Sequence, residues 1–174
     1  MTSPPRKRGL SADPRTILTS PIHLLAFGLG LGLAPKAPGT FGTLLGVPAW
    51  FALSQLPPLA YFATVAALFA FGCWLTGESA RRLGEHDVPG IVFDEVVGFL
   101  VTTAPLLPVF GHPPYPYWML LAAAFVVFRV FDIWKPWPIR RLDAGVPGGF
   151  GIMLDDLVAG LYGAAVLTFA RILP

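Results

Sequence analysis

The chain alternates long apolar stretches with short connections that are polar or rich in proline. A helix needs about 20 apolar residues to cross the hydrocarbon core of a bilayer. Three stretches meet this requirement well, at residues 59–75, 91–110 and 117–134. A fourth, at residues 152–173, meets it if the two acids near its start lie at a membrane interface.

Two shorter apolar stretches precede these four. Residues 41–56 predict either a fifth crossing or a re-entrant segment, and residues 22–33, which contain several glycines, predict an interfacial helix. Prolines fall mostly between the stretches, where helices should stop, and Pro105 and Pro108 should kink or end their span early. The pattern therefore predicts an all-α polytopic membrane bundle with about four transmembrane helices (three to five) and an N-terminal interfacial helix.

The length of 174 residues predicts one domain. We expect a single membrane-embedded domain at residues 17–174, preceded by a disordered cytoplasmic tail at residues 1–16. Arg6, Lys7 and Arg8, followed by an apolar run, have the outline of a signal peptide. Because that run continues into a glycine-proline motif and further spans follow, we expect the segment to stay in the mature protein.

The composition supports a membrane location. Apolar residues make up 55% of the chain and charged residues only 13%, whereas an average soluble protein has about 25% charged residues. The mean hydropathy is +0.66. Such a chain cannot cover a water-facing surface with polar groups, so its surroundings must be partly hydrocarbon. The net charge of +2 is too small to indicate a nucleic-acid partner.

The positions of the basic residues predict an orientation. The connections at residues 56–58 and 111–116 carry no lysine or arginine. If residues 41–56 cross the membrane, every basic connection falls on one side, and the positive-inside rule makes that side cytoplasmic. If they do not cross, the N-terminus and the Arg81 connection fall on opposite sides, so the charge pattern favours the crossing.

Six of the ten acids lie at or near the ends of the predicted spans: Asp94, Glu95, Asp132, Asp143, Asp155 and Asp156. A charge at mid-bilayer costs about 2.5–3.5 kcal/mol on insertion scales, so acids in spans usually have a function and a partner. With the predicted topology, three helices bring five of these acids to a similar depth on the cytoplasmic side. Helix capping or ordinary ion pairs could explain any one of them. Doubled acids on two helices that face a third favour a Mg²⁺ site, since Mg²⁺ prefers oxygen ligands.

Each of four further polar residues has two possible interpretations. Lys135 could form an ion pair with Asp132 on the helix end or bind phosphate. Arg140 is a candidate phosphate ligand, although it could simply obey the positive-inside rule. His86 and Asp87, in the loop before Asp94, could be a general acid/base pair or an ordinary loop ion pair.

The second unusual stretch is a glycine-proline loop at residues 30–43, which includes Lys36, Gly39 and Thr40. Glycine permits backbone shapes that point consecutive N–H groups at an anion, and Thr40 could cap the helix that follows. The loop is therefore a candidate phosphate-binding site. It could also be a hinge, and it lacks the Gly-Lys-Ser/Thr of a Walker sequence.

Several motifs together resemble a known family, phosphatidylglycerophosphatase A. They lie at residues 32–42, 86–87, 94–98, 128–140 and 148–156, and the similarity runs from about residue 20 to the end. The resemblance implies Mg²⁺-dependent hydrolysis of the lipid phosphatidylglycerophosphate to phosphatidylglycerol and phosphate, in phospholipid biosynthesis at the bacterial cytoplasmic (inner) membrane. The residues that match the family's motif positions are Asp94, Glu95, Asp132, Lys135, Asp155 and Asp156.

A carboxylate-lined membrane cation transporter is the alternative function, because it would also use acids within the membrane. Such a transporter should place some acids near mid-membrane, whereas here they stay close to one face. A CDP-alcohol phosphotransferase would share Mg²⁺ and a lipid substrate, but its Asp-Gly-x-x-Ala-Arg signature is absent. The sequence leaves open whether the protein forms a homo-oligomer.

Overall fold

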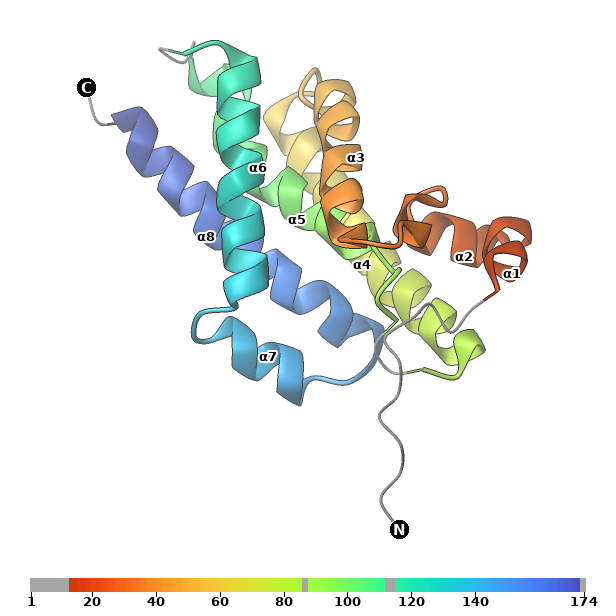
Figure 1. Ribbon diagram of the computed structural model, residues 1–174. Helices are drawn as coiled ribbons and strands as arrows, with labels where there is room; N and C mark the ends of the chain where they lie inside the picture. Colours follow the sequence, from red (N-terminus) through yellow and green to blue (C-terminus); the bar gives the residue numbers. More distant parts are fainter. Residues whose placement is uncertain (1–12, 86–87, 112–114, 173–174) are drawn as a thin grey trace.

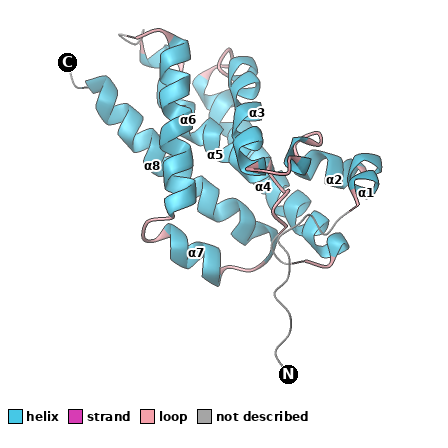
Figure 2. Ribbon diagram, in the orientation of Figure 1, coloured by secondary structure: helices cyan, strands magenta, loops and turns pink. Residues whose placement is uncertain are grey.

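The computed structural model describes residues 13–85, 88–111 and 115–172, and every regular element in these ranges is helical (Figures 1 and 2). The elements are α1 (Pro14–Thr19), α2 (Pro21–Ala26), η1 (Leu31–Leu33), α3 (Pro38–Leu53), α4 (Pro58–Leu83), α5 (Phe93–Thr103), η2 (Ala104–Leu106), η3 (Pro108–Phe110), α6 (Tyr117–Trp134), α7 (Ile139–Gly145) and α8 (Gly148–Ile172). The prediction of an all-α bundle is confirmed.

Four segments are long and apolar enough to cross a membrane: Pro58–Leu83, Phe93–Phe110, Tyr117–Trp134 and Gly148–Ala170. The protein is therefore a multi-pass membrane protein with four candidate spans, as predicted. The Phe93–Phe110 segment contains α5 and two 3₁₀ turns, so the helix ends ahead of Pro105, as expected for a proline in a span. Helix α6 ends where Lys135 adopts a left-handed conformation and Pro136 follows.

Helix α3 runs through the bundle in the same direction as α5. It begins at Pro38, where Gly39 lies against Glu95 near the start of α5. At its other end, Ser54 and Leu107 line one cavity, beyond the end of α5. Its 16 residues span about 24 Å at 1.5 Å per residue. Because the chain does not turn back, this geometry supports a crossing rather than a re-entrant segment.

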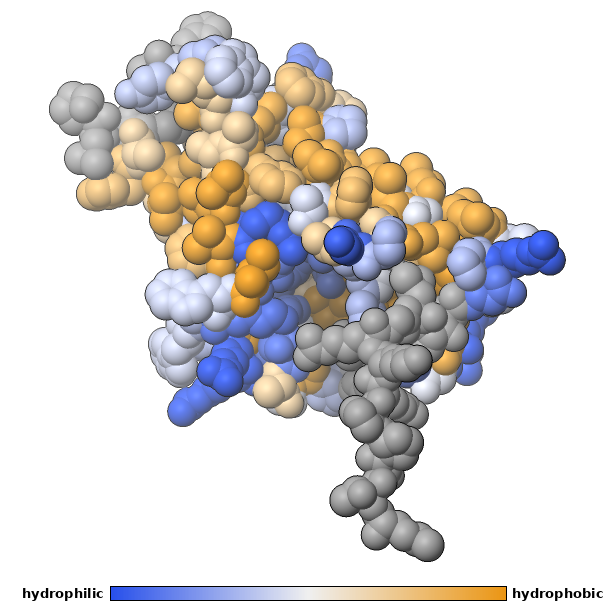
Figure 3. Space-filling model, viewed as in Figure 1, coloured by the Kyte–Doolittle hydropathy of each residue, from blue (hydrophilic) through white to orange (hydrophobic). Residues whose placement is uncertain are grey.

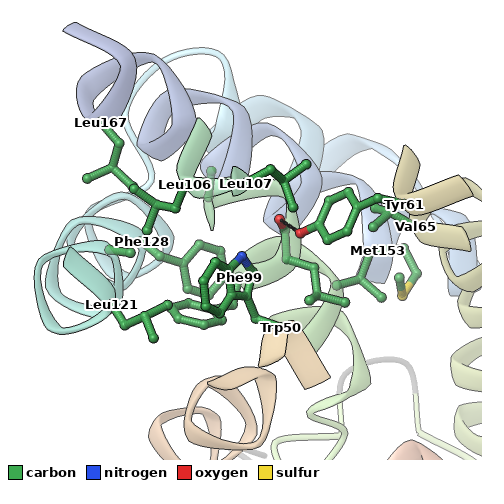
Figure 4. Close-up of a cluster of buried hydrophobic side chains, with 14 of the residues drawn as sticks. Trp50, Tyr61, Val65, Phe99, Leu106, Leu107, Leu121, Phe128, Met153 and Leu167 are labelled. Carbon is green, nitrogen blue, oxygen red and sulfur yellow. Dashed lines mark hydrogen bonds between the residues drawn. The ribbon is translucent and has the colours of Figure 1, made fainter. Parts of the chain in front are cut away.

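Helix α8 is the centre of the bundle and packs against α4, α5, α6 and α7. Large apolar side chains from all the long helices form the core that surrounds it (Figure 4). Tyr61, which is fully buried, donates its hydroxyl to the Leu100 carbonyl at 2.7 Å. Buried threonines bond to carbonyls one turn earlier, as Thr102 does with Gly98. These hydroxyl groups are thus bonded within the protein, whereas Trp50 Nε1 is buried without a hydrogen-bond partner.

Glycines allow two very close helix contacts. Gly160 of α8 lies against Gly98 of α5, and a Cβ on Gly160 would come within 2.5 Å of the Gly98 carbonyl oxygen. Gly149 of α8 lies against Gly77 and Cys73 of α4, and a Cβ there would overlap the Cys73 carbonyl oxygen. Small residues at such contacts are typical of helices that pack in membranes. These contacts fix the position of α8 relative to both neighbours.

Two sequence predictions differ from the structure. Helix α1 begins at Pro14, capped by Asp13, so residues 14–16 are helical rather than a disordered tail, while residues 1–12 lie outside the described ranges. The 22–33 stretch is not one helix, because α2 ends at Ala26 and Gly28, Leu29 and Gly30 have positive φ before η1. Residues 148–151 form the first turn of α8 and pack on α4.

The surface separates into apolar and polar regions. Figure 3 shows an apolar band over α6 and α3, and hydrophilic residues gathered around α7 below it. Large apolar side chains such as Trp118, Val126 and Phe169 are exposed within the candidate spans. An exposed apolar band of this kind is expected where a protein contacts lipid.

The Gly149 contact yields a stability prediction. Gly149→Ala forces α8 away from α4, because its Cβ meets backbone rather than a flexible side chain, and overpacking of this kind costs about 1–3 kcal/mol. Gly145→Ala is the matched control, since nothing lies within 4 Å of that Cβ. We expect a lower melting temperature in detergent for Gly149→Ala and no loss for the control. Equal melting temperatures would contradict the close contact.

Candidate functional site

A cavity of about 360 Å³ opens at the end of the bundle where α5 and α8 begin and α6 ends. Its lining includes all six carboxylates that the sequence analysis singled out, together with Lys135. Asp94 and Glu95 lie in the first turn of α5, and Asp132 lies in the last turn of α6, as expected. Asp155 and Asp156 lie about two turns into α8 rather than in its first turn, because α8 already begins at Gly148.

Three of the carboxylates converge. Asp94, Glu95 and Asp156 each offer an oxygen atom, and these atoms lie within 4.8 Å of one another. One oxygen of each, Oδ1 of Asp94, Oε2 of Glu95 and Oδ2 of Asp156, is buried without a hydrogen-bond partner. A buried polar atom without a partner is rare and needs an explanation. A divalent cation with oxygen ligands fits this donor set, and Mg²⁺ has the required chemistry.

The close helix contact at Gly98 creates this convergence. A Cβ on Gly98 would come within 2.8 Å of the Asp156 carbonyl oxygen, so α5 and α8 touch there through their backbones. Asp94 lies one turn before Gly98 on α5, on the cavity side of the contact. The glycine therefore determines how near the acids of the two helices can come.

The other two acids of the predicted cluster have basic partners. Asp155, whose side chain is 9% exposed, accepts from Lys135 Nζ at 2.7 Å. Asp132 lies 2.5 Å from Nη1 of Arg129, one turn earlier on α6. All five acids were predicted as metal ligands. The structure brings Asp94, Glu95 and Asp156 to a common point, and it gives Asp132 and Asp155 ion pairs at the rim of that group.

Lys135 connects α7 to α8. Its Nζ also donates to Asp143 of α7, at 2.8 Å, and the Asp143 side chain is 47% exposed. Burial alone lowers the pKa of Lys135, but its two carboxylate partners outweigh that effect and raise the pKa above its ordinary value. The ammonium group therefore stays charged at neutral pH at the mouth of an acidic cavity, where an anionic ligand would enter.

Arg129 is the functional candidate that the sequence analysis missed. Its side chain is 15% exposed, and Nη1 lies 3.7 Å from Glu95 Oε1 as well as beside Asp132. The signal was present in the sequence, because a charge within an apolar span is costly and usually has a partner. That rule was applied to the acids and not to the one arginine inside the 117–134 stretch.

The remaining predicted ligands lie outside the cavity lining. Gly39 is buried against Glu95 and Arg129, so the glycine-proline loop packs on the acid cluster from behind. Thr40 is half-buried, and Lys36 and Arg140 are exposed. The predicted phosphate-binding role of these four residues stays a prediction. His86 and Asp87 lie outside the described residues.

The fold and the cavity define a class: a multi-pass membrane protein with an acidic site, suited to a divalent cation, at one end of a helical bundle. The chain belongs to the phosphatidylglycerophosphatase A family, whose model matches residues 24–171. The family that the sequence motifs predicted is therefore confirmed. It is an enzyme, a phosphatase.

The curated relatives cover nearly the whole chain. The phosphatidylglycerophosphatase A of Escherichia coli is 42% identical over 97% of this chain and 94% of its own length. The Haemophilus influenzae protein of the same name is 42% identical over 88% of this chain and 90% of its own length. A Bacteroides thetaiotaomicron protein, provisionally described as a phosphatidylinositol-3-phosphatase, is 39% identical over 85% of this chain and 92% of its own length. No solved structure matches the chain.

The Lys135 ion pairs yield the second prediction. Lys135→Met leaves the carboxylate of Asp155 nearly buried without a partner, which should cost about 1–3 kcal/mol. Lys36→Met is the control, because it also removes one lysine charge but at an exposed position. Thermal unfolding in detergent should show a lower melting temperature for Lys135→Met alone. If both variants melt together, the Lys135–Asp155 pair does not stabilise the fold.

Proposed function

We propose that this protein hydrolyses phosphatidylglycerophosphate to phosphatidylglycerol and phosphate, with Mg²⁺, as a step of phospholipid biosynthesis. The observation that carries the proposal is the group of three buried, unpartnered carboxylate oxygens of Asp94, Glu95 and Asp156 in a protein of this family. The substrate follows from the names of the two relatives at 42% identity.

The charge of the cavity supports a requirement for a cation. Six carboxylates line it, and among the described residues the basic side chains that form ion pairs with them are Lys135 and Arg129. The terminal phosphate of the substrate is itself an anion. Without added positive charge, it would be repelled by the very residues that line the site. A divalent cation offsets that repulsion and also occupies the unpartnered oxygens.

The proposed chemistry is attack of water on the terminal phosphorus and departure of the lipid hydroxyl. Mg²⁺, when bound, supplies a water of lowered pKa and neutralises charge on the transferring group. The chain's own residues then have distinct tasks. Asp94, Glu95 and Asp156 hold the cation, and Lys135 binds phosphate oxygens as the phosphate displaces one of its two carboxylates. Product release restores the Lys135 ion pairs.

The surroundings of the cavity suit a lipid substrate. Ile133 and Trp134 follow Asp132 directly, and each is 71% exposed on the outer side of α6. The headgroup can therefore enter the cavity while the acyl chains stay in the bilayer beside α6. Exposed tryptophan is typical of the membrane–water interface, which supports a position of the cavity at that depth.

The basic residues support an orientation with the cavity facing the cytoplasm of a bacterial inner membrane. Arg81 and Arg82 at the end of α4, and Arg140 and Arg141 on α7, lie at the cavity end of the bundle. The connection between α3 and α4 at the other end carries no basic residue. The positive-inside rule assigns the basic end to the cytoplasm.

The transporter alternative is weaker, because a conduction path needs polar groups through the whole membrane. None of the nine acids in the described part of the chain lies in the half of the bundle that contains the ends of α3 and α5. The buried side chains described there carry no charge: Trp50, Leu106 and Leu107 belong to the apolar core (Figure 4). The hydroxyls of Tyr61 and Thr102 are bonded to backbone carbonyls.

The direct test measures phosphate release from phosphatidylglycerophosphate in detergent micelles, with Mg²⁺ and then with excess chelator. We expect release that depends on Mg²⁺.

Asp156→Asn should lower kcat/KM by about 100-fold or more, and Asp13→Asn, which keeps the cap of α1, should not change it. Mg²⁺ should also raise the melting temperature of the wild type and not of Asp156→Asn.

Two outcomes would contradict the proposal. No release from folded wild-type protein in either condition would exclude the substrate, and full activity of Asp156→Asn would exclude the site. A parallel assay with phosphatidylinositol 3-phosphate tests the second headgroup that the Bacteroides relative's description raises.

A further inference from the structure

Arg129 lies behind the acid cluster rather than in the cavity. Its guanidinium is held between Asp132 on its own helix and Glu95 on α5, with Nη1 2.5 Å from Asp132 Oδ2 and 3.7 Å from Glu95 Oε1. Glu95 and Asp132 line the cavity, whereas Arg129 does not. A phosphate in the cavity would therefore meet the two carboxylates and not the arginine, so Arg129 can act on the reaction only through its partners.

The two oxygens of Glu95 have different surroundings. Oε1 faces Arg129, and Oε2 is buried without a hydrogen-bond partner. A carboxylate that is held by one oxygen has a restricted orientation, which leaves the other oxygen pointing in a defined direction. Mutation of residues that orient metal ligands in this way typically lowers metal affinity by about 10- to 100-fold.

Gly39 forms the third side of this arrangement. It is buried at the first turn of α3, where a Cβ would overlap Glu95 Oε1 and come within 2.8 Å of Arg129 Nη1. Thr43 fixes this turn by donating its hydroxyl to the Gly39 carbonyl at 2.8 Å. The absent side chain of Gly39 is thus what gives Glu95 and Arg129 room to meet.

We propose that Arg129 and Gly39 are positioning residues for the cation site: together they hold Glu95 Oε1 so that Oε2 is directed to the cation shared with Asp94 and Asp156. The inference deepens the proposed function and rests on its cation site. It also proposes a role for the glycine-proline loop: the loop packs behind the acid cluster and supports it, rather than binding phosphate.

The closing experiment compares Arg129→Lys with Arg81→Lys. Arg81 is the matched control, because it also pairs with an acid three residues away on a long helix, Glu78 at 2.8 Å, but is exposed and remote from the cavity. For each purified variant we would measure Mn²⁺ binding by electron paramagnetic resonance, and then kcat and the Mg²⁺ concentration for half-maximal activity.

Arg129→Lys keeps the positive charge but removes the planar guanidinium that faces both Asp132 and Glu95. We expect Mn²⁺ to bind about 10- to 100-fold more weakly, with the half-activating Mg²⁺ concentration raised by the same factor. The value of kcat at saturating Mg²⁺ should change far less, because the ligands themselves are intact. Arg81→Lys should match the wild type in every measurement.

Gly39→Ala tests the same idea without touching a charge. Its Cβ would displace Glu95, so it should weaken Mn²⁺ binding as Arg129→Lys does, while Gly145→Ala, with open space around its Cβ, should not. If one variant fails to fold, the other still decides the matter.

The possible results separate this inference from the proposed function. If the folded Arg129→Lys or Gly39→Ala protein binds Mn²⁺ as tightly as the wild type, the positioning role is overturned. This holds even if kcat is lower in that variant. Weakened Mn²⁺ binding in both variants supports it. If the wild type binds Mn²⁺ but does not hydrolyse phosphatidylglycerophosphate, the proposed function fails while the Mn²⁺ titrations still test the positioning of Glu95.

Discussion

The backbone contact between α5 and α8 at Gly98 and Gly160 is the constraint on which the site depends. It brings two helices together without side chains between them, and the acids one turn away converge as a result. A larger residue at either glycine would push the helices apart, so Asp94 and Asp156 would no longer lie close together. Helix packing within the apolar core and ligand geometry at its polar end are therefore set by the same contact.

The converging acids destabilise the fold, and the proposed cation site would account for their presence. Burial and mutual repulsion disfavour three carboxylates whose oxygens lie within 4.8 Å. Arg129 and Lys135 offset part of this cost at the rim, through short ion pairs with Asp132 and Asp155, and Asp94, Glu95 and Asp156 remain for the proposed cation. Asp132 and Asp155 are thus closely paired, whereas Glu95 meets Arg129 at 3.7 Å and only through Oε1.

Much of this could be predicted from the sequence. Apolar length gave the spans, because the bilayer fixes helix length, and the cost of charge in a membrane singled out the acids. The division among the acids could not be predicted, because it depends on which carboxylates face Arg129 and Lys135 in three dimensions. The packing of Gly39 could not be predicted for a related reason: the sequence shows a flexible residue, while only the structure shows that Glu95 and Arg129 occupy the space of its missing side chain.

The central claim is that Asp94, Glu95 and Asp156 form one cation site. Anomalous scattering from crystals of the wild-type protein grown with Mn²⁺ tests this most directly, because it locates the ion without reference to activity. The account predicts a peak bounded by these three carboxylates. Ordered Mn²⁺ found only elsewhere, for example at the exposed Asp143 on α7, would contradict it.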